Sequence, residues 1–187
     1  MKRVFARSLG LLAAGLGMHA VAPAADGAAE VAQGAYLVKS GGCSDCHTPW
    51  KMGPKGPEPD GSRGLSGHPQ GMMLPPAPAG QGPWIWGGAA TNTAFWGPWG
   101  ISYASNLTPD VETGIGAWTV EQFIGAMRKG QHLGNGRPIL PPMPWQPFGM
   151  KNDADLKAIF AYLKSQSAVK NAVPANQAPT QPTATPR

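Results

Sequence analysis

The chain of 187 residues has two cysteines, and both lie in one five-residue sequence, Cys43-Ser44-Asp45-Cys46-His47. A C-x-x-C-H sequence is the attachment signature of c-type haem. The two thiols of such a site add to the two vinyl groups of one haem, and the two intervening residues let both sulfurs reach one edge of the macrocycle. The histidine that follows supplies an imidazole nitrogen to the iron. The motif therefore predicts one covalent haem c, held by Cys43 and Cys46, with His47 as an axial iron ligand.

Three other uses of this motif compete with haem. A thioredoxin-like dithiol needs a βαβ context, and the sequence has no strand pattern that would supply one. A zinc site commonly takes four ligands from two separated pairs, and the chain has no second cysteine pair. A disulfide across two intervening residues is strained. The helical pattern before the motif and an export signal favour haem over all three.

The first 25 residues have the order of segments found in a secretory signal peptide. Three basic residues, all within the first seven positions, precede an apolar run from residue 8 to residue 25. Ala22-Pro23-Ala24 then matches the small-residue cleavage pattern. We expect residues 1–24 to be a signal peptide and the mature protein to be periplasmic, with an uncleaved anchor as the alternative. No later apolar run is long enough to cross a bilayer.

The charge and the aromatic content exclude several classes of protein. The formal net charge is +5, from 15 basic and 10 acidic residues. Lys2, Arg3 and Arg7 belong to the predicted signal peptide, so the rest of the chain keeps 12 basic and 10 acidic residues and a charge of +2. That excess is too small to indicate a nucleic-acid-binding protein. Seven tryptophans argue against a chain that is disordered throughout.

Three segments have the capping residues or the apolar periodicity of helices. They are residues 26–40, 119–130 and 153–166. Asp26, Thr119 and Asn152 are suitable N-caps, and Thr119 with Gln122 matches a capping box. Gly34, inside the first segment, is either tolerated at a cost of about 1 kcal/mol or required by the close approach of another helix.

The segment between the first two helices has a different composition. Residues 48–100 contain 12 glycines, 10 prolines and five of the seven tryptophans. No helical or strand period is present, so we expect an irregular but ordered loop insertion that covers a surface. We assign residues 25–170 to one domain that includes this loop. Residues 171–187, rich in Pro, Thr, Gln and Ala, are expected to form a disordered tail.

A second axial ligand is predicted from Leu140-Pro141-Pro142-Met143-Pro144-Trp145. Three prolines fix the backbone around Met143, and a thioether on such a stiff loop suits an iron ligand. The alternative is that Met143 fills a gap in the core. The other residues that could supply the second axial ligand are Met52, Met72, Met73, Met150, His68 and His132.

The two propionates of a haem need cations or hydrogen-bond donors where they are partly buried. Arg137, which lies shortly before Met143, is the first candidate to bind them. The alternative for Arg137 is a solvated surface arginine. The further candidate donors are Trp145, Tyr103 and Asn106.

The order of helix, C-x-x-C-H, variable middle, methionine and final helix resembles that of class I c-type cytochromes. Gly34 and Tyr36 resemble the N-terminal helix of that family, and Phe160 and Tyr162 resemble its aromatic C-terminal helix. In the family these two helices cross closely, which would account for Gly34. The resemblance implies an all-α, cytochrome c-like fold of three to four helices around one covalent haem, with the Gly/Pro/Trp-rich segment as a long covering loop.

A narrower resemblance covers residues 101–174. The stretches that carry it are residues 106–110, 112–119 and 136–145. They are similar to bacterial periplasmic cytochromes in which the methionine matching Met143 is the iron ligand. Many members are subunits or electron acceptors of periplasmic dehydrogenases, which implies such a partner here. The interval of 96 positions from His47 to Met143 exceeds that of a minimal class I cytochrome, because of the tryptophan-rich segment.

These features predict a periplasmic electron carrier rather than an enzyme. One haem with His47 and Met143 as axial ligands would pass single electrons from a dehydrogenase or membrane quinol oxidoreductase to an oxidase or another cytochrome. The alternative is a peroxidase-like haem enzyme or a gas sensor with an open distal site, for which His68 and Arg63 are the candidate pair. A third hypothesis is a permanently bound subunit whose haem serves as a passive wire.

Overall fold

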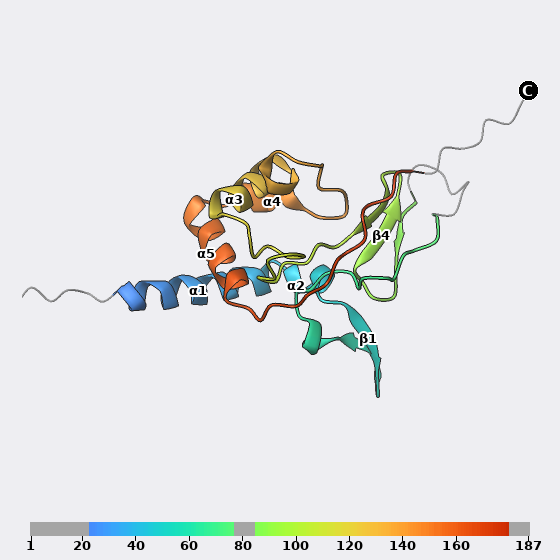
Figure 1. The fold of residues 1–187 in the computed structure, drawn as a ribbon, viewed down its shortest axis with the longest axis horizontal. Coiled ribbons are helices and arrows are strands. Elements are labelled where there is room, and N and C mark those ends of the chain that lie inside the picture. The colour runs from blue at the N-terminus through green and yellow to red at the C-terminus, as the bar shows by residue number, and fades with distance from the viewer. Residues whose placement is uncertain (1–22, 77–84, 180–187) are drawn as a thin grey trace, which may run out of the picture.

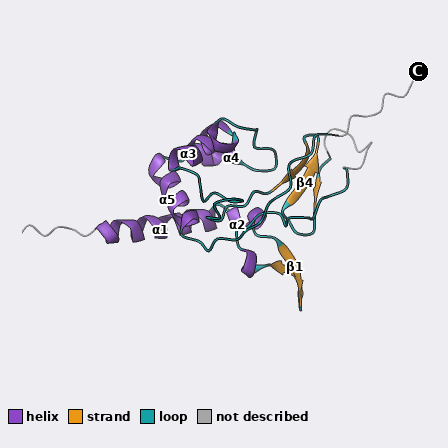
Figure 2. Cartoon of the chain, in the orientation of Figure 1, coloured by secondary structure: helices purple, strands orange, loops and turns teal. Residues whose placement is uncertain are grey.

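The computed structural model describes residues 23–76 and 85–179, and Figure 1 shows how their elements are arranged. These residues contain five α-helices: α1 (Pro23–Ser40), α2 (Cys43–His47), α3 (Val120–Lys129), α4 (Trp145–Gly149) and α5 (Asp153–Lys164). Two short 3-10 turns, Gly61–Arg63 and His132–Gly134, accompany them. The longer helices lie on one side of the molecule, and the strands around β4 lie on the other (Figure 2).

Two small antiparallel sheets are also present. β1 (Trp50–Gly53) pairs with β2 (Gly56–Pro59), and β4 (Ala94–Gly97) lies between β3 (Gly87–Gly88) and β5 (Gly100–Tyr103). The fold is therefore not all-α, and the segment 48–100 is not uniformly irregular. Each strand has only two to four residues, which is too short for an alternating pattern to be recognised in the sequence.

The predicted helices at 119–130 and 153–166 are confirmed as α3 and α5. Thr119 and Gln122 form the expected capping box before α3, and Asn152 caps α5 by accepting a hydrogen bond from the Asp155 amide. The first helix begins three residues earlier than predicted, so Asp26 lies inside α1 rather than at its N-cap. Proline suits the first turn of a helix because its missing N–H has no partner there anyway, which explains the start at Pro23.

α1 packs directly against α5, and a glycine makes this contact possible. A methyl group at Gly34 would overlap the carbonyl group of Ala158 and approach the Cβ of Tyr162. Gly34 is therefore required by helix contact rather than merely tolerated. The aromatic pair Phe123 and Phe160 joins α3 to α5, with ring centroids 5.4 Å apart.

The segment that follows α5 forms a strap across the molecule, and we call residues 169–177 the C-terminal strap. Asn171 is fully buried, and its side-chain amide donates to the carbonyls of Ser66 (2.6 Å) and His68 (2.8 Å). Its side-chain oxygen accepts from the Arg63 guanidinium at 2.9 Å. Gln177 then pairs with Ile101 of β5 through two backbone hydrogen bonds of 2.9 Å.

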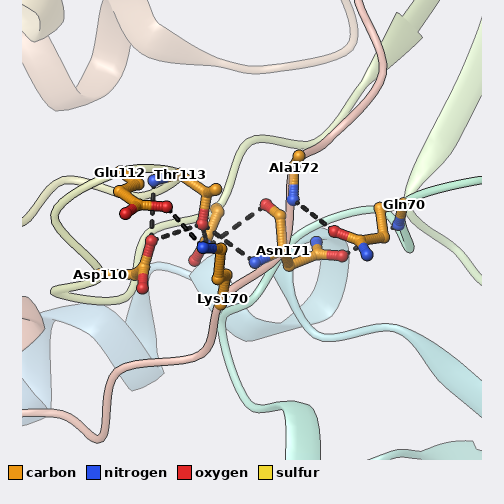
Figure 3. A network of polar contacts seen from close by, with 8 residues as sticks. Gln70, Asp110, Glu112, Thr113, Lys170, Asn171 and Ala172 are labelled. Carbon is orange, nitrogen blue, oxygen red and sulfur yellow. Dashed lines mark hydrogen bonds and ion pairs between the residues drawn. The ribbon is translucent and has the colours of Figure 1, made fainter.

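Figure 3 shows the polar contacts on both sides of Asn171. The Ala172 amide donates to the Gln70 side chain at 3.0 Å, and the Asn171 amide donates to Thr113 Oγ1 at 2.9 Å. The Lys170 ammonium pairs with Glu112 at 2.6 Å. The predicted disorder from residue 171 is therefore wrong for residues 171–179. Their order comes from side-chain to backbone hydrogen bonds, which a polar composition does not reveal.

Two predictions fall largely outside the described residues. Of the predicted signal peptide, residues 1–22 lie outside them, and Pro23 and Ala24 belong to α1. Residues 180–187 of the predicted tail also lie outside them. Over residues 23–76 and 85–179, no helix has the length and apolar character needed to span a membrane.

Candidate functional site

A cavity of about 650 Å³ lies between the helices and the β3–β5 sheet. Parts of α2, α3, α5, β4 and β5 line it, together with residues from the connecting segments 104–107, 112–118, 137–144 and 172–176. Walls from so many parts of the chain mean that the whole fold determines its shape. The apolar wall includes Ile115, Phe123, Met127, Ile139, Phe148, Leu156, Ile159 and Leu163.

α2 is the C-x-x-C-H motif itself, folded as a short helix against the cavity. Gly42, in the left-handed conformation with φ of 68°, turns the chain between α1 and α2. Cys43, Cys46 and His47 all line the cavity. Both thiols are free. Burial raises the pKa of Cys43 to about 11 and also raises the pKa of Cys46, so both are protonated at neutral pH.

His47 is held in a form that can bind a metal. Its Nδ1 donates a hydrogen bond to the backbone carbonyl of Ser105 at 2.8 Å. Because Nδ1 carries the proton, Nε2 keeps its lone pair, which is the usual arrangement of a metal-binding histidine. Burial lowers the pKa of His47, so that the ring is neutral at pH 7. Ser105 lies two residues after the end of β5, which means that the sheet helps to orient this imidazole.

Met143 lines the same cavity as the motif, 96 residues further along the chain. Its loop is tied to the sheet by Ser102 of β5, whose hydroxyl donates to the Pro141 carbonyl at 2.6 Å. The prolines and this hydrogen bond both restrain the loop. The structure therefore brings the two thiols of the motif, the His47 imidazole and the Met143 thioether to a single cavity, which Met127 and His132 also line.

Of the other candidate axial ligands, all but His132 lie outside the cavity lining. The methionines at positions 52, 72, 73 and 150 do not line the cavity, and Met150 is 86% exposed. His68 is buried away from the cavity, with Nδ1 bonded to Thr93 Oγ1 at 2.8 Å and Nε2 bonded to the carbonyl of Met72. Arg63 is bonded to Asn171, so the candidate peroxidase pair does not reach the cavity. His132 does line it.

The candidate propionate partners are divided between the cavity and other places. Arg137 lines the cavity from its exposed rim, where partial burial lowers the pKa of its guanidinium, which stays charged. Trp145 does not line the cavity, contrary to the prediction, because α4 begins there and the indole packs against Gly130 at the end of α3. Tyr103 and Asn106 line it but bond to other parts of the chain.

Several lining residues, Trp118 among them, had no predicted role. Trp118 forms an edge-to-face pair with the candidate ligand His132, with ring centroids 4.8 Å apart. Phe95 of β4 and residues 172–176 of the strap also contribute. Trp118 lies in a stretch that carried the resemblance, which is the one sequence signal for it. The sequence has no signal for the strap.

Comparisons with known proteins give relatives but no matching family model. A nicotinate dehydrogenase subunit of Pseudomonas putida is 35% identical over 181 residues, covering 93% of this chain and 12% of that protein. The cytochrome c subunit of gluconate 2-dehydrogenase from Pantoea cypripedii is 32% identical over 155 residues, covering 81% of this chain and 27% of that protein. The cytochrome c subunit of alcohol dehydrogenase (quinone) from Gluconobacter oxydans is 39% identical over 82 residues, covering 44% of this chain and 16% of that protein.

The chain spans between 12% and 27% of the length of these relatives. The first match covers 93% of the chain, and it therefore takes in most of the segment 48–100. Two of the three relatives carry cytochrome c in their names, which confirms the resemblance predicted from the sequence. The chain is thus homologous to cytochrome c subunits of bacterial dehydrogenases.

Proposed function

We propose that this chain binds one haem c covalently through Cys43 and Cys46 and serves as a one-electron carrier rather than an enzyme. One observation carries the proposal, namely that both thiols, His47 and Met143 line one largely apolar cavity. Its volume of about 650 Å³ lies within the range of cofactor sites. The donor set also fits the group, since two thiols can form thioethers while an imidazole and a thioether are typical axial ligands of haem iron.

His47 and Met143 are the proposed axial ligands, through Nε2 and the thioether sulfur. When bound, the haem supplies a reversible one-electron couple at its iron. The thioether of Met143 favours the ferrous state, and the apolar wall excludes water and disfavours extra charge. Both effects raise the reduction potential. Arg137, at the rim of the cavity, is the proposed partner of a propionate.

The proposed partners follow from the relatives. A dehydrogenase is the proposed electron donor, since the homologous cytochrome c subunits belong to dehydrogenases. A membrane quinol oxidoreductase is the alternative donor, and an oxidase or another cytochrome is the proposed acceptor. The periplasm is the proposed location, supported by the signal-peptide pattern of residues 1–24.

A visible absorption spectrum tests the function. The protein, exported together with a haem-attachment system, is measured oxidised and after reduction with dithionite. Sharp low-spin bands on reduction, with the weak charge-transfer band of methionine-bound ferric iron on oxidation, are expected. A high-spin spectrum that shifts at once with carbon monoxide would instead favour the haem enzyme or gas sensor.

Replacing the proposed axial methionine tests its role. Met143→Ala is expected to keep the covalent haem, lower the reduction potential and let carbon monoxide bind, because the thioether ligand is lost. Met150→Ala is the matched control, since this side chain is exposed and does not line the cavity. Ligand spectra and a potential that stay unchanged in Met143→Ala would contradict the assignment.

A further inference from the structure

The charged residues of this chain are distributed very unevenly. Between Arg63 and Asp110, 46 consecutive residues contain no Asp, Glu, Lys or Arg. The same holds for residues 171–179, which follow Lys170. About a quarter of the residues of an ordinary soluble protein are charged, so a segment of 46 residues without charge needs a physical explanation.

The two charge-free segments meet in the structure. Leu74, Trp96 and Val173 pack against the small core of the β3–β5 sheet, which joins residues 64–76, the sheet and the strap. Gln177 adds to the edge of β5 by pairing with Ile101. Figure 1 shows these segments running side by side near β4, away from α1. We call this part of the molecule, built from residues 64–76, 85–109 and 171–179, the charge-free end.

Large apolar side chains are exposed on the charge-free end. Their exposed fractions are 45% for Met72, 64% for Met73, 46% for Ile85 and 57% for Trp86. Methionine and tryptophan are enriched at the centres of protein interfaces, whereas charged residues are depleted there. Exposed apolar side chains on segments that contain no charged residue are typical of interaction surfaces.

The lack of charge indicates which kind of partner fits this surface. A transient redox partner is usually steered and oriented by complementary charges. A lipid surface attracts lysine and arginine, which are absent from these segments. A permanent protein interface is the remaining match, because it buries apolar surface and tolerates no unpaired charge. By the same complementarity, the partner face must also be uncharged.

One exposed side chain connects the charge-free end to the cavity. Trp86 packs against Phe95 of β4, with ring centroids 6.3 Å apart. Phe95 is itself buried and lines the cavity. A protein seated on Trp86 is therefore separated from the cavity by this aromatic pair. Contact at this position is suited to electron transfer as well as to attachment.

We propose that the charge-free end is the permanent docking surface for an uncharged, apolar face of the dehydrogenase subunit that donates electrons, with Trp86 at its centre. This inference rests on the proposed function, since a donor subunit has meaning only if the chain carries electrons. It deepens that function by assigning the partner to one side of the molecule. It also favours a stable complex over a freely diffusing carrier.

The test inserts a charge into the surface. The full-length haem protein is purified from its own bacterium, and the co-purifying dehydrogenase subunit is identified by mass spectrometry and used as the binding probe. Trp86→Glu is expected to weaken binding by about 100-fold, as for the central residue of an interface. Tyr36→Glu is the matched control, because Tyr36 is 66% exposed on α1 and far from any charge-free segment in sequence. Trp86→Phe is expected to bind nearly as well as the unchanged protein.

Salt dependence provides a second measurement. Binding of the unchanged protein is expected to vary less than about threefold between roughly 0.05 and 0.5 M sodium chloride, since no surface charges need to be screened. The proposal is overturned if Trp86→Glu binds normally, if salt abolishes binding, or if no dehydrogenase subunit co-purifies. It is equally overturned if the surface instead pairs two copies of this chain, or binds vesicles of phosphatidylcholine and phosphatidylglycerol.

The visible spectrum separates this proposal from the proposed function. A preparation with haem bands but no bound dehydrogenase overturns the docking surface and leaves the electron carrier intact. A preparation without haem bands overturns the electron carrier, whatever it binds. The spectrum of Trp86→Glu must also match that of the unchanged protein, which shows that the variant is folded.

Discussion

His47 and His68 are both buried, but the structure uses their rings differently. His47 has Nδ1 bonded to the Ser105 carbonyl, and the residue lies against the cavity. His68 has both ring nitrogens bonded, to Thr93 and to Met72. A metal ligand needs a nitrogen with a free lone pair. His68 is therefore a structural residue, and His47 is the candidate ligand.

The burial of His68 predicts a pH-dependent stability. Burial, and to a lesser extent the nearby Arg63 charge, lowers the pKa of His68 below its ordinary value of 6.5. Below pH 6.5 the unfolded chain then binds a proton that the folded chain does not, so the free energy of unfolding falls as the pH falls. The contribution is at most about 1.4 kcal/mol per pH unit.

His68→Gln removes this titration. Denaturant unfolding at a series of pH values, from about 8 down to about 5, measures the free energy of unfolding of both proteins. The variant is expected to be less stable at the upper end of this range, because it loses buried hydrogen bonds, and the difference is expected to shrink toward the lower end. Two parallel stability profiles would contradict the prediction.

Among the elements, the contact between α1 and α5 depends on one glycine. Gly34→Ala is expected to destabilise the protein by about 1–3 kcal/mol, because the added methyl group meets the backbone of Ala158. Gly27→Ala in the same helix is the control, since nothing lies within 4 Å of the added atom. The control is expected to gain up to about 1 kcal/mol from better helix propensity. Thermal unfolding measures the change in stability caused by each substitution. Equal changes for Gly34→Ala and Gly27→Ala would argue against a steric role for Gly34.

The elements differ in how well the sequence predicts them. α3 and α5 have caps and apolar stripes within about a dozen residues, so their bounds were predicted to within one or two residues. The strands of the two sheets are too short for such a pattern. β4 and β5 are instead fixed by contacts with distant residues, as in the pairing of Ile101 with Gln177. Local sequence cannot show contacts of this kind.

At the scale of the whole molecule, the C-terminal strap, residues 169–177, forms one wall of the cavity. Residues 172–176 line the cavity, and Asn171 holds the strap against residues 63–70. The C-x-x-C-H motif and Met143 could be proposed as site residues because their chemistry is visible in a few adjacent residues. The strap could not, because its hydrogen bonds join residues about a hundred positions apart.

Truncation tests the strap. A chain ending at Lys170 is expected to lose at least about 2 kcal/mol of unfolding free energy, because the buried carbonyls of Ser66 and His68 lose their donor. A chain ending at Pro179 keeps every strap residue and is the matched control. Thermal and denaturant unfolding measure both. Equal stability of the two chains would show that the strap does not contribute to the fold.

The position of the strap, more than 120 residues after the C-x-x-C-H motif, also affects the order in which the walls of the cavity are made. Ribosomes synthesise a chain from its N-terminus, so Cys43, Cys46 and His47 are complete long before residues 172–176. Until those last residues take their place, one wall of the cavity is missing. A large planar group can thus be joined to the thiols before the fold closes around it. The strap is therefore the part of the cavity wall that is synthesised last, well after the motif that holds the proposed haem.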